Sequence, residues 1–174
     1  IDRIGHVERK VDTDLFSAVV HHIVGQQIST KAQETIWQRM LSALGEVNAE
    51  TVLAAGVPKL QSLGMTFKKA EYITDFAEKI RSGAFNLESV KYMSDADAIR
   101  ALSSLKGIGV WTAQMFLMFT LARPDIFAPD DRGLQLAIKK LYSLPEVPGR
   151  VELEAIATKW SPYRTVASYH LWHS

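Results

Sequence analysis

The chain has 174 residues, of which 47% are hydrophobic, and it carries a formal net charge of +1 at pH 7 and no cysteine. This length allows one or two small domains with a real core, and this hydrophobic content excludes a disordered chain. The absence of cysteine excludes disulfides, thiol catalysis and iron–sulfur clusters held by cysteine. A charge of +1 is low for a nucleic-acid-binding protein, unless acidic residues elsewhere balance a basic face.

Helix signals dominate the sequence, and no stretch shows sustained alternation of apolar and polar residues between turns, so the predicted fold class is all-α. The candidate helix caps are Asp12 or Thr13, Thr30 with Gln33, Thr66, and Ser94 with Asp97. In chain order, the expected helices cover about residues 14–25, 30–44, 49–55, 58–63, 67–81, 86–93, 95–104, 111–121, 131–142, 150–160 and 162–174.

The stretch from Ala101 to Tyr142 organises the rest of the chain, and it predicts a helix, a tight turn, a helix, a loop and a helix. Gly107 and Gly109 allow the turn to adopt positive φ and a close approach of backbone to a neighbour. The turn opens a largely apolar helix, whose N-terminal N–H groups and positive dipole end suit a phosphate. Asp131 follows Trp111 by twenty positions and stands at the start of the last helix of this stretch.

This pattern resembles the helix-hairpin-helix DNA glycosylases. The resemblance rests on LKGIGVWTA at residues 105–113, on Asp131 at this distance, and on the ending WSPYR…LW at residues 160–172. The WTA tripeptide, the PDD segment at 129–131 and the ending resemble the 3-methyladenine DNA glycosylase II branch in particular. The similarity covers about residues 14–172 and is weakest over 42–64.

The resemblance implies a single glycosylase domain over residues 1–174 with two helical subdomains and a DNA-binding cleft between them. We expect residues 1–48 and 143–174 to form one subdomain and residues 49–142 to form the hairpin-containing subdomain. Familiar relatives of this branch carry an additional β-rich N-terminal domain, for which this chain has no room. The chain is therefore expected to be a compact form or a fragment.

Asp131 is the expected catalytic residue. Cleavage of an N-glycosidic bond builds positive charge on the sugar, and a carboxylate stabilises that charge and orients or deprotonates the attacking water. An N-alkylated purine is already a cationic leaving group, so no dedicated general acid is needed. The alternative is that the aspartate only caps a helix. We assign this capping or supporting role to Asp130 instead.

The resemblance also implies DNA contacts from the hairpin and from the first interhelical loop. Backbone N–H groups of the hairpin would bind a DNA phosphate, and Gln27 would enter the duplex to fill the gap left by a flipped nucleotide. A monovalent cation would bind to the backbone carbonyls of Ser103, Leu105 and Ile108, and no other cofactor is expected. The expected DNA-binding residues are Gln26, Gln27, Gly107, Ile108, Gly109, Val110 and Thr112.

The expected base pocket contains Trp111, Met115 and Trp172. Lyase relatives carry a nucleophilic lysine at the position of Trp111, and Lys106 does not replace it, so we predict a monofunctional enzyme that uses water. Indole faces attract a cationic base and favour alkylated purines over normal ones. The alternative is that Trp111 and Trp172 pack in the hydrophobic core and do not contact the base. Met115 stands where one relative has an aromatic residue.

Several further polar residues are given structural or surface roles. These are the pairs His21–His22 and His170–His173, which lack metal-site partners, and the residues Lys68, Lys69, Lys139, Lys140, Lys159 and Arg164, which are expected on a solvated or phosphate-facing surface.

The resulting prediction is a monomeric, monofunctional glycosylase that excises N-alkylated purines such as 3-methyladenine and 7-methylguanine from double-stranded DNA in base excision repair. No apolar run approaches a membrane span and no export signal is recognised, so a cytoplasmic, nucleoid-associated or nuclear location is expected. The main alternative is a non-catalytic helix-hairpin-helix DNA-binding module. A glycosylase for mismatched adenine or oxidised bases is disfavoured, because those relatives usually carry the four-cysteine cluster or the lysine.

Overall fold

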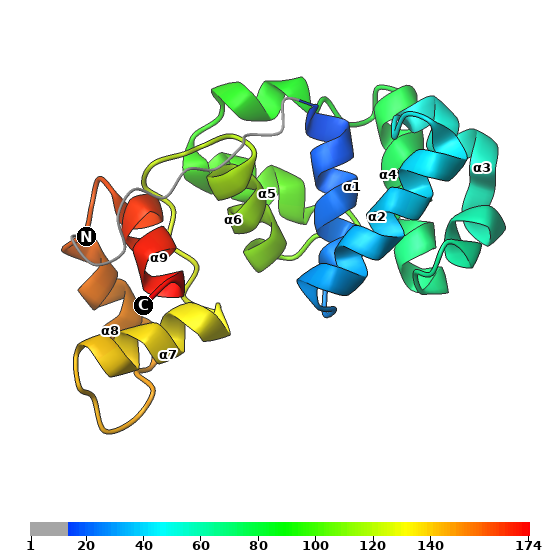
Figure 1. The fold of residues 1–174 in the computed structure, drawn as a ribbon. Coiled ribbons are helices and arrows are strands. Elements are labelled where there is room, and N and C mark those ends of the chain that lie inside the picture. Colours follow the sequence, from blue (N-terminus) through cyan, green and yellow to red (C-terminus); the bar gives the residue numbers. More distant parts are fainter. Residues whose placement is uncertain (1–13) are drawn as a thin grey trace. The chain divides into compact units, whose positions relative to one another are not determined.

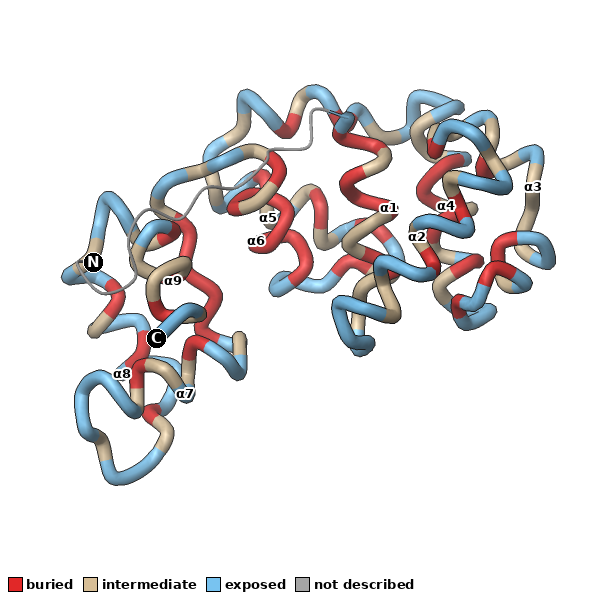
Figure 2. Tube along the Cα trace, viewed as in Figure 1, coloured by how far each residue is buried: buried red, intermediate tan, exposed pale blue. Residues whose placement is uncertain are grey.

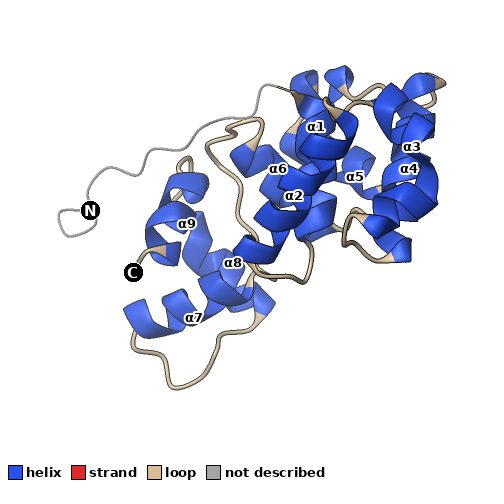
Figure 3. Ribbon diagram, turned by 45° about the vertical axis from the view of Figure 1, so that its right-hand side comes forward, coloured by secondary structure: helices blue, strands red, loops and turns tan. Residues whose placement is uncertain are grey.

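The structure is a computed structural model that describes residues 14–174, so the predicted caps Asp12 and Thr13 lie outside the described residues. Helices and loops make up these residues, and Figure 3 shows no strand among them, which confirms the all-α prediction. The elements shown in Figure 1 are α1 (Leu15–Gly25), α2 (Thr30–Leu44), α3 (Ala49–Ser62), α4 (Phe67–Arg81), the 3₁₀-helix η1 (Glu88–Tyr92), α5 (Asp95–Ser103), α6 (Val110–Phe119), α7 (Arg132–Leu141), α8 (Arg150–Thr158) and α9 (Arg164–Trp172).

The chain divides into two compact units, which meet in sequence within α6. One unit contains residues 14–116 of the described chain, and the other contains residues 117–174. This division differs from the expected grouping of residues 1–48 with 143–174. The reason is that α1 packs against α2 and α4, and α2 also packs against α3, so the first helices belong to the hairpin-containing unit.

The core of the unit over residues 14–116 is centred on α1. This helix buries most of its length, as the red segments of Figure 2 show, and Phe16 stacks on Phe76 of α4 with ring centroids 5.0 Å apart. The side chains of Ile23, Ile73 and Phe76 are almost completely buried. Burial of each such side chain stabilises the fold by about 1.5–3 kcal/mol. These contacts therefore hold α1 and α4 together.

In the unit over residues 117–174, α7 packs against α9. Phe119 stacks on Tyr169 with ring centroids 5.5 Å apart, and the Tyr169 hydroxyl donates a 2.9 Å hydrogen bond to the carbonyl of Met118. Leu134 and Ile138 are completely buried on one face of α7, four residues apart. This spacing places both side chains on the same face of the helix, which packs into the core from its first turn onward.

Two of the predicted helix caps are confirmed and one is wrong. The hydroxyl oxygens of Thr66 and Ser94 accept hydrogen bonds from the N–H groups at their N3 positions, at 3.2 and 3.1 Å. The second helix is capped by Ser29, whose hydroxyl accepts from Ala32 N at 3.2 Å. The predicted box of Thr30 with Gln33 is not formed, because the Gln33 amide donates to the carbonyl of His21.

The stretch after Asn48 contains the predicted break between two short helices. Gly56 has φ +71° and ψ 168° inside the span of α3, and Pro58 follows at the start of the second piece. Proline is favourable there, because its fixed φ suits a first helical turn. None of the helices within residues 14–174 has the length and apolar character needed to cross a membrane.

We predict that the stability of the fold depends on His22 at mildly acidic pH. Burial, with a smaller contribution from His21, lowers the pKa of His22 from 6.5 to about 4. Since the unfolded chain binds more protons than the fold between these values, stability that is present above pH 6.5 is lost as the pH falls toward 4. Urea unfolding should show a loss of about 2 kcal/mol between pH 7 and pH 5. An unchanged slope in His22→Gln would assign this loss to other groups.

Candidate functional site

The hairpin between α5 and α6 is shaped by Gly107. This glycine has φ +79°, and a Cβ added to it would lie 2.1 Å from Cδ2 of Tyr72 on α4. The aromatic ring therefore occupies the space that any other side chain would need. Only glycine combines this close approach with a left-handed backbone conformation at low cost.

An ion pair attaches the same hairpin to α4 a second time. The Lys106 ammonium lies 2.7 Å from Oδ1 of Asp75, and Lys79 lies 2.7 Å from Oδ2 of the same carboxylate. Hydrogen bonds from Lys106 and Lys79 lower the pKa of Asp75. Lys106 therefore has an ion-pair partner on α4.

A pocket of about 610 Å³ lies beside the hairpin. Three segments that are distant in sequence form its wall: the loop between α1 and α2, the first turn of α4, and the hairpin itself. Its lining residues are Gln26, Gln27, Ile28, Thr66, Lys68, Lys69, Tyr72, Ser103, Leu105, Gly107, Ile108 and Gly109. The structure thus brings together Gln27 and the hairpin, two elements that the sequence predicts to contact DNA.

Gln26 and Thr112 were expected to bind DNA, but their side chains face the protein. The Gln26 amide nitrogen donates to the carbonyl of Gly107 at 2.7 Å and to Oγ1 of Thr112 at 3.2 Å. Thr112 is buried on α6. Both side chains connect the first interhelical loop to the hairpin, and a direct contact of Gln26 and Thr112 with DNA stays a prediction.

Gln27 lies at the tip of the loop between α1 and α2. It is exposed and has φ +56°, in the left-handed region that non-glycine residues seldom adopt. Such a conformation costs about 1 kcal/mol or more and persists only where surrounding contacts impose it. Such conformations cluster at functional sites, so the exposed Gln27 is a candidate contact residue.

The hairpin presents some of its backbone N–H groups outward and uses others internally. The N–H of Ile108 donates to the carbonyl of Leu105 at 3.2 Å, and the side chain of Ile108 is buried. Ile108 is therefore part of the turn itself. Gly109 and Val110 begin α6, where the first N–H groups of a helix have no acceptor within the helix. These groups are the anion-binding candidates of the hairpin.

In the other unit, Asp131 is the N-cap of α7. Its Oδ1 accepts a 2.9 Å hydrogen bond from the N–H of Leu134 and another 2.9 Å bond from Nε1 of Trp172. The two donors come from different helices and hold the carboxylate in one orientation. Trp172 is half-buried and packs against Phe119 and Tyr169, with ring centroids 5.7 and 6.0 Å away.

Gly133 makes the contact between Asp131 and Trp172 possible. A Cβ at this position would lie 3.1 Å from Oδ1 of Asp131 and 3.1 Å from Cδ1 of Trp172. A larger residue at this position would therefore require the indole or the carboxylate to shift by a few tenths of an ångström. The sequence analysis missed Gly133, although a glycine two residues after a candidate catalytic aspartate is a signal that can be read directly.

Asp130 has a supporting role and does not cap the helix. Its Oδ2 lies 3.1 Å from Nη1 of Arg150, and Nε of the same arginine lies 3.0 Å from Glu154. Asp131 caps α7, and Asp130 attaches the loop to the start of α8, which is the supporting alternative of the role predicted for it.

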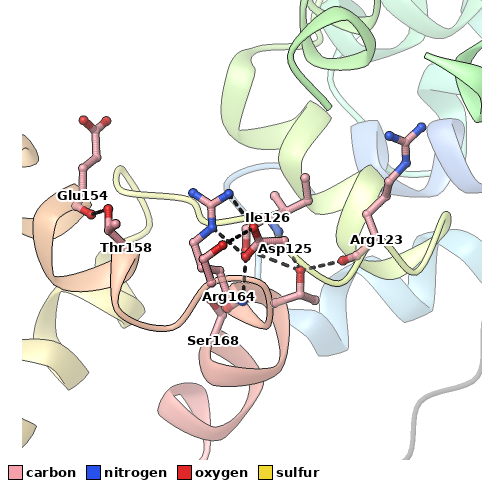
Figure 4. A network of polar contacts seen from close by, with 9 residues as sticks. Arg123, Asp125, Ile126, Glu154, Thr158, Arg164 and Ser168 are labelled. Carbon is pink, nitrogen blue, oxygen red and sulfur yellow. Dashed lines mark hydrogen bonds and ion pairs between the residues drawn. The ribbon is translucent and has the colours of Figure 1, made fainter. Parts of the chain in front are cut away.

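A second ion pair holds the loop that leads to Asp131, as Figure 4 shows. Asp125 accepts from Nε and Nη2 of Arg164 at 2.8 and 3.0 Å and from the Ser161 hydroxyl at 2.8 Å. The Arg164 guanidinium is the main cause that lowers the pKa of the Asp125 carboxyl to about 2. Arg164 therefore anchors α9 to this loop, and a phosphate-facing role for it is not needed to explain its position.

The expected base-pocket residues are divided between the two units. Trp111 and Met115 lie on the part of α6 that belongs to residues 14–116, with Trp111 40% exposed and Met115 4% exposed. Trp172 lies on α9 in the unit over residues 117–174. No group of three or more histidine, aspartate or glutamate side chains within the described residues could hold a metal ion.

Two helices, α5 and α6, joined by a glycine turn define a helix-hairpin-helix motif. The profile of the HhH-GPD superfamily of base excision DNA repair proteins matches residues 20–162, and the chain belongs to this family.

Named relatives share most of this chain. It is 32% identical over 171 residues to the DNA-3-methyladenine glycosylase of Bacillus subtilis, covering 91% of this chain and 56% of that protein. A DNA-3-methyladenine glycosidase structure from Bacillus halodurans has 34% identity and a TM-score of 0.87, covering 99% of this chain and 81% of that one. The Schizosaccharomyces pombe 3-methyladenine DNA glycosylase Mag1, solved with abasic DNA, has 25% identity and a TM-score of 0.87, with 98% and 86% covered.

We predict that the two hairpin glycines respond differently to alanine. Gly107→Ala should destabilise the protein by about 2–4 kcal/mol, because it combines left-handed strain with overpacking against Tyr72. Gly109→Ala is the matched control, since a Cβ there meets nothing within 4 Å, and it should change stability by less than about 0.5 kcal/mol. Urea unfolding of both variants checks this, and equal effects would contradict the assigned role of Tyr72.

Proposed function

We propose that the protein is a monofunctional DNA glycosylase that removes N-alkylated purines from double-stranded DNA and acts as a monomer. The observation that carries this proposal is the Asp131 carboxylate, held by two hydrogen bonds at the start of α7 in a chain of the HhH-GPD superfamily. The names of the similar proteins, which are DNA-3-methyladenine glycosylases, support alkylated purines as substrates.

In the proposed reaction, the bond between C1′ of the sugar and the nitrogen of the base breaks and leaves positive charge on the sugar. Asp131 stabilises this charge and orients a water molecule that attacks C1′. The donors Leu134 N and Trp172 Nε1 both bind Oδ1, so the orientation of the carboxylate is set before substrate arrives. Such preorganisation lowers the cost of reorganisation in the transition state.

Trp111 supports hydrolysis by water and selectivity for cationic bases. An indole has no nucleophilic amine, so a Schiff base cannot form at this position. Its 40% exposed ring is proposed to contact the flipped base. A positively charged alkylpurine is attracted to an indole face by about 0.5–2 kcal/mol.

The hairpin is proposed to bind a phosphate of the duplex through the N–H groups at the start of α6, while Gln27 fills the space left by the flipped nucleotide. We also propose a Na⁺ or K⁺ ion on the carbonyls of Ser103, Leu105 and Ile108. The residues fit such an ion, since the buried Ser103 hydroxyl has no hydrogen-bond partner in the described part of the chain and lines the pocket beside the hairpin. The ion would add positive charge next to the phosphate.

A non-catalytic DNA-binding module remains the second candidate function. It is favoured by the hairpin alone, which binds DNA backbone without reading sequence. It offers no reason for the orientation of Asp131 by Trp172 or for the small residue at Gly133.

We predict that Asp131→Asn abolishes base release while it leaves the fold intact, because asparagine caps a helix as well as aspartate does. Base release from methylated duplex DNA should fall by at least about 100-fold. Strand breaks in the wild-type reaction should arise only after alkali treatment. Full activity of the variant would refute the mechanism, and DNA binding without base release by the wild type would favour the non-catalytic module.

Trp172→Phe should distinguish the contribution of the hydrogen bond to Asp131 from the contribution of aromatic packing. The phenyl ring keeps packing against Phe119 and Tyr169 but cannot donate to Asp131. We expect kcat to fall by about 3–10-fold, the loss that one hydrogen bond explains, with a smaller change in KM. An unchanged kcat would show that Leu134 N alone orients the carboxylate.

A further inference from the structure

The loop between α1 and α2 is held at one residue by contacts from two distant elements. The Gln26 side chain donates to Gly107 and Thr112 of the hairpin and α6. The Gln26 carbonyl accepts a 2.7 Å hydrogen bond from the Lys69 ammonium, which also donates to the carbonyl of Val24 at 2.8 Å. Gln26 is therefore fixed at both its side chain and its backbone, and the strained Gln27 follows directly.

We propose that Gln26 and Lys69 form a loop anchor that holds Gln27 in the orientation for insertion into the duplex and couples it to the hairpin. Both are positioning residues that act through Gln27 and do not touch the substrate. The inference rests on the proposed function, since it assumes that Gln27 enters the duplex and that the hairpin binds the backbone.

Lys69 is suited to this role by its place at the end of α1. The carbonyl groups that it binds lie at the last turn of this helix, where the helix dipole is negative and carbonyls lack partners within the helix. Burial lowers the pKa of Lys69, because the ammonium is partly removed from water. Its neighbour Lys68 is exposed and remains available to a phosphate.

Gln26 is suited to its role by having a side-chain NH₂ group. One nitrogen serves both the Gly107 carbonyl and the Thr112 hydroxyl, so the loop and the hairpin move as one element. Glutamate has nearly the same shape but offers oxygen where the Gly107 carbonyl needs a donor. Gln26→Glu therefore breaks the anchor at the hairpin without leaving a cavity.

The test measures affinity for two duplexes, one intact and one containing a tetrahydrofuran abasic-site analogue. Gln27 insertion strengthens binding only where a base is missing, whereas hairpin contacts strengthen both complexes. We expect Gln26→Glu and Lys69→Met each to reduce the ratio of the two affinities by about tenfold, because each substitution removes two hydrogen bonds of the anchor and part of that loss reaches Gln27. Gln27→Ala should reduce the ratio as strongly, and it should have little further effect in the Gln26→Glu background.

The matched controls are Gln38→Glu on α2 and Lys59→Met on α3, which make the same changes of charge at exposed positions. Both should keep the wild-type affinity ratio. Additive effects of Gln26→Glu and Gln27→Ala, or an equal loss of affinity for both duplexes, would overturn the loop anchor and leave the proposed function standing. A wild-type protein with no preference for the abasic duplex would overturn the insertion role of Gln27 and the anchor together. Gln26→Glu removes the side-chain contacts of the anchor, and Lys69→Met removes its backbone contacts. If one of these variants misfolds, the other still tests the proposal.

Discussion

The hydrogen bond from the Gln26 amide to the carbonyl of Gly107 is the contact on which the unit over residues 14–116 depends for its functional geometry. It joins residues 81 positions apart over 2.7 Å. The ring of Tyr72 packs on the same glycine, and Asp75 holds the neighbouring Lys106, so α4 supports the hairpin from behind. The loop between α1 and α2 and the hairpin between α5 and α6 are thus both held in place through contacts with the same hairpin glycine and with α4.

Local chemistry made much of this fold predictable. The helices follow from apolar spacing, and the caps at Thr66 and Ser94 follow from side chains that can bind an N–H three residues on. The hairpin and the helix that starts after Asp131 were also predictable, because glycine favours tight turns and aspartate favours the N-cap of a helix. The resemblance to a family then added roles that spacing alone does not give.

Contacts between distant segments were not predictable in the same way. Gln26 and Lys69 are polar residues near helix ends. Gln26 binds Gly107, 81 residues away, and Lys69 binds Gln26, 43 residues away. The neighbouring sequence does not distinguish such side chains from ones that face water. The grouping of α1 with the hairpin helices has the same origin, because both faces of α1 are apolar and its sequence does not identify the neighbour. Ser29 displaced Thr30 as a cap because adjacent hydroxyl residues offer equivalent bonds, and tertiary packing decides between them.

One oxygen atom of Asp131 accepts two hydrogen bonds. Its Oδ1 caps α7 by accepting from Leu134 N, and it also accepts from Nε1 of Trp172. Replacing an N-cap aspartate with alanine costs about 1 kcal/mol of stability, whatever the residue does for a reaction. Selection for a folded chain therefore retains a polar residue here even where the chemistry is no longer used, and a descendant that had lost its activity could keep this aspartate for structural reasons. The neighbouring Gly133 is less easily explained by stability: glycine lowers the stability of a helix, and the nearest atoms that a Cβ there would meet belong to the Asp131 carboxylate and the Trp172 indole.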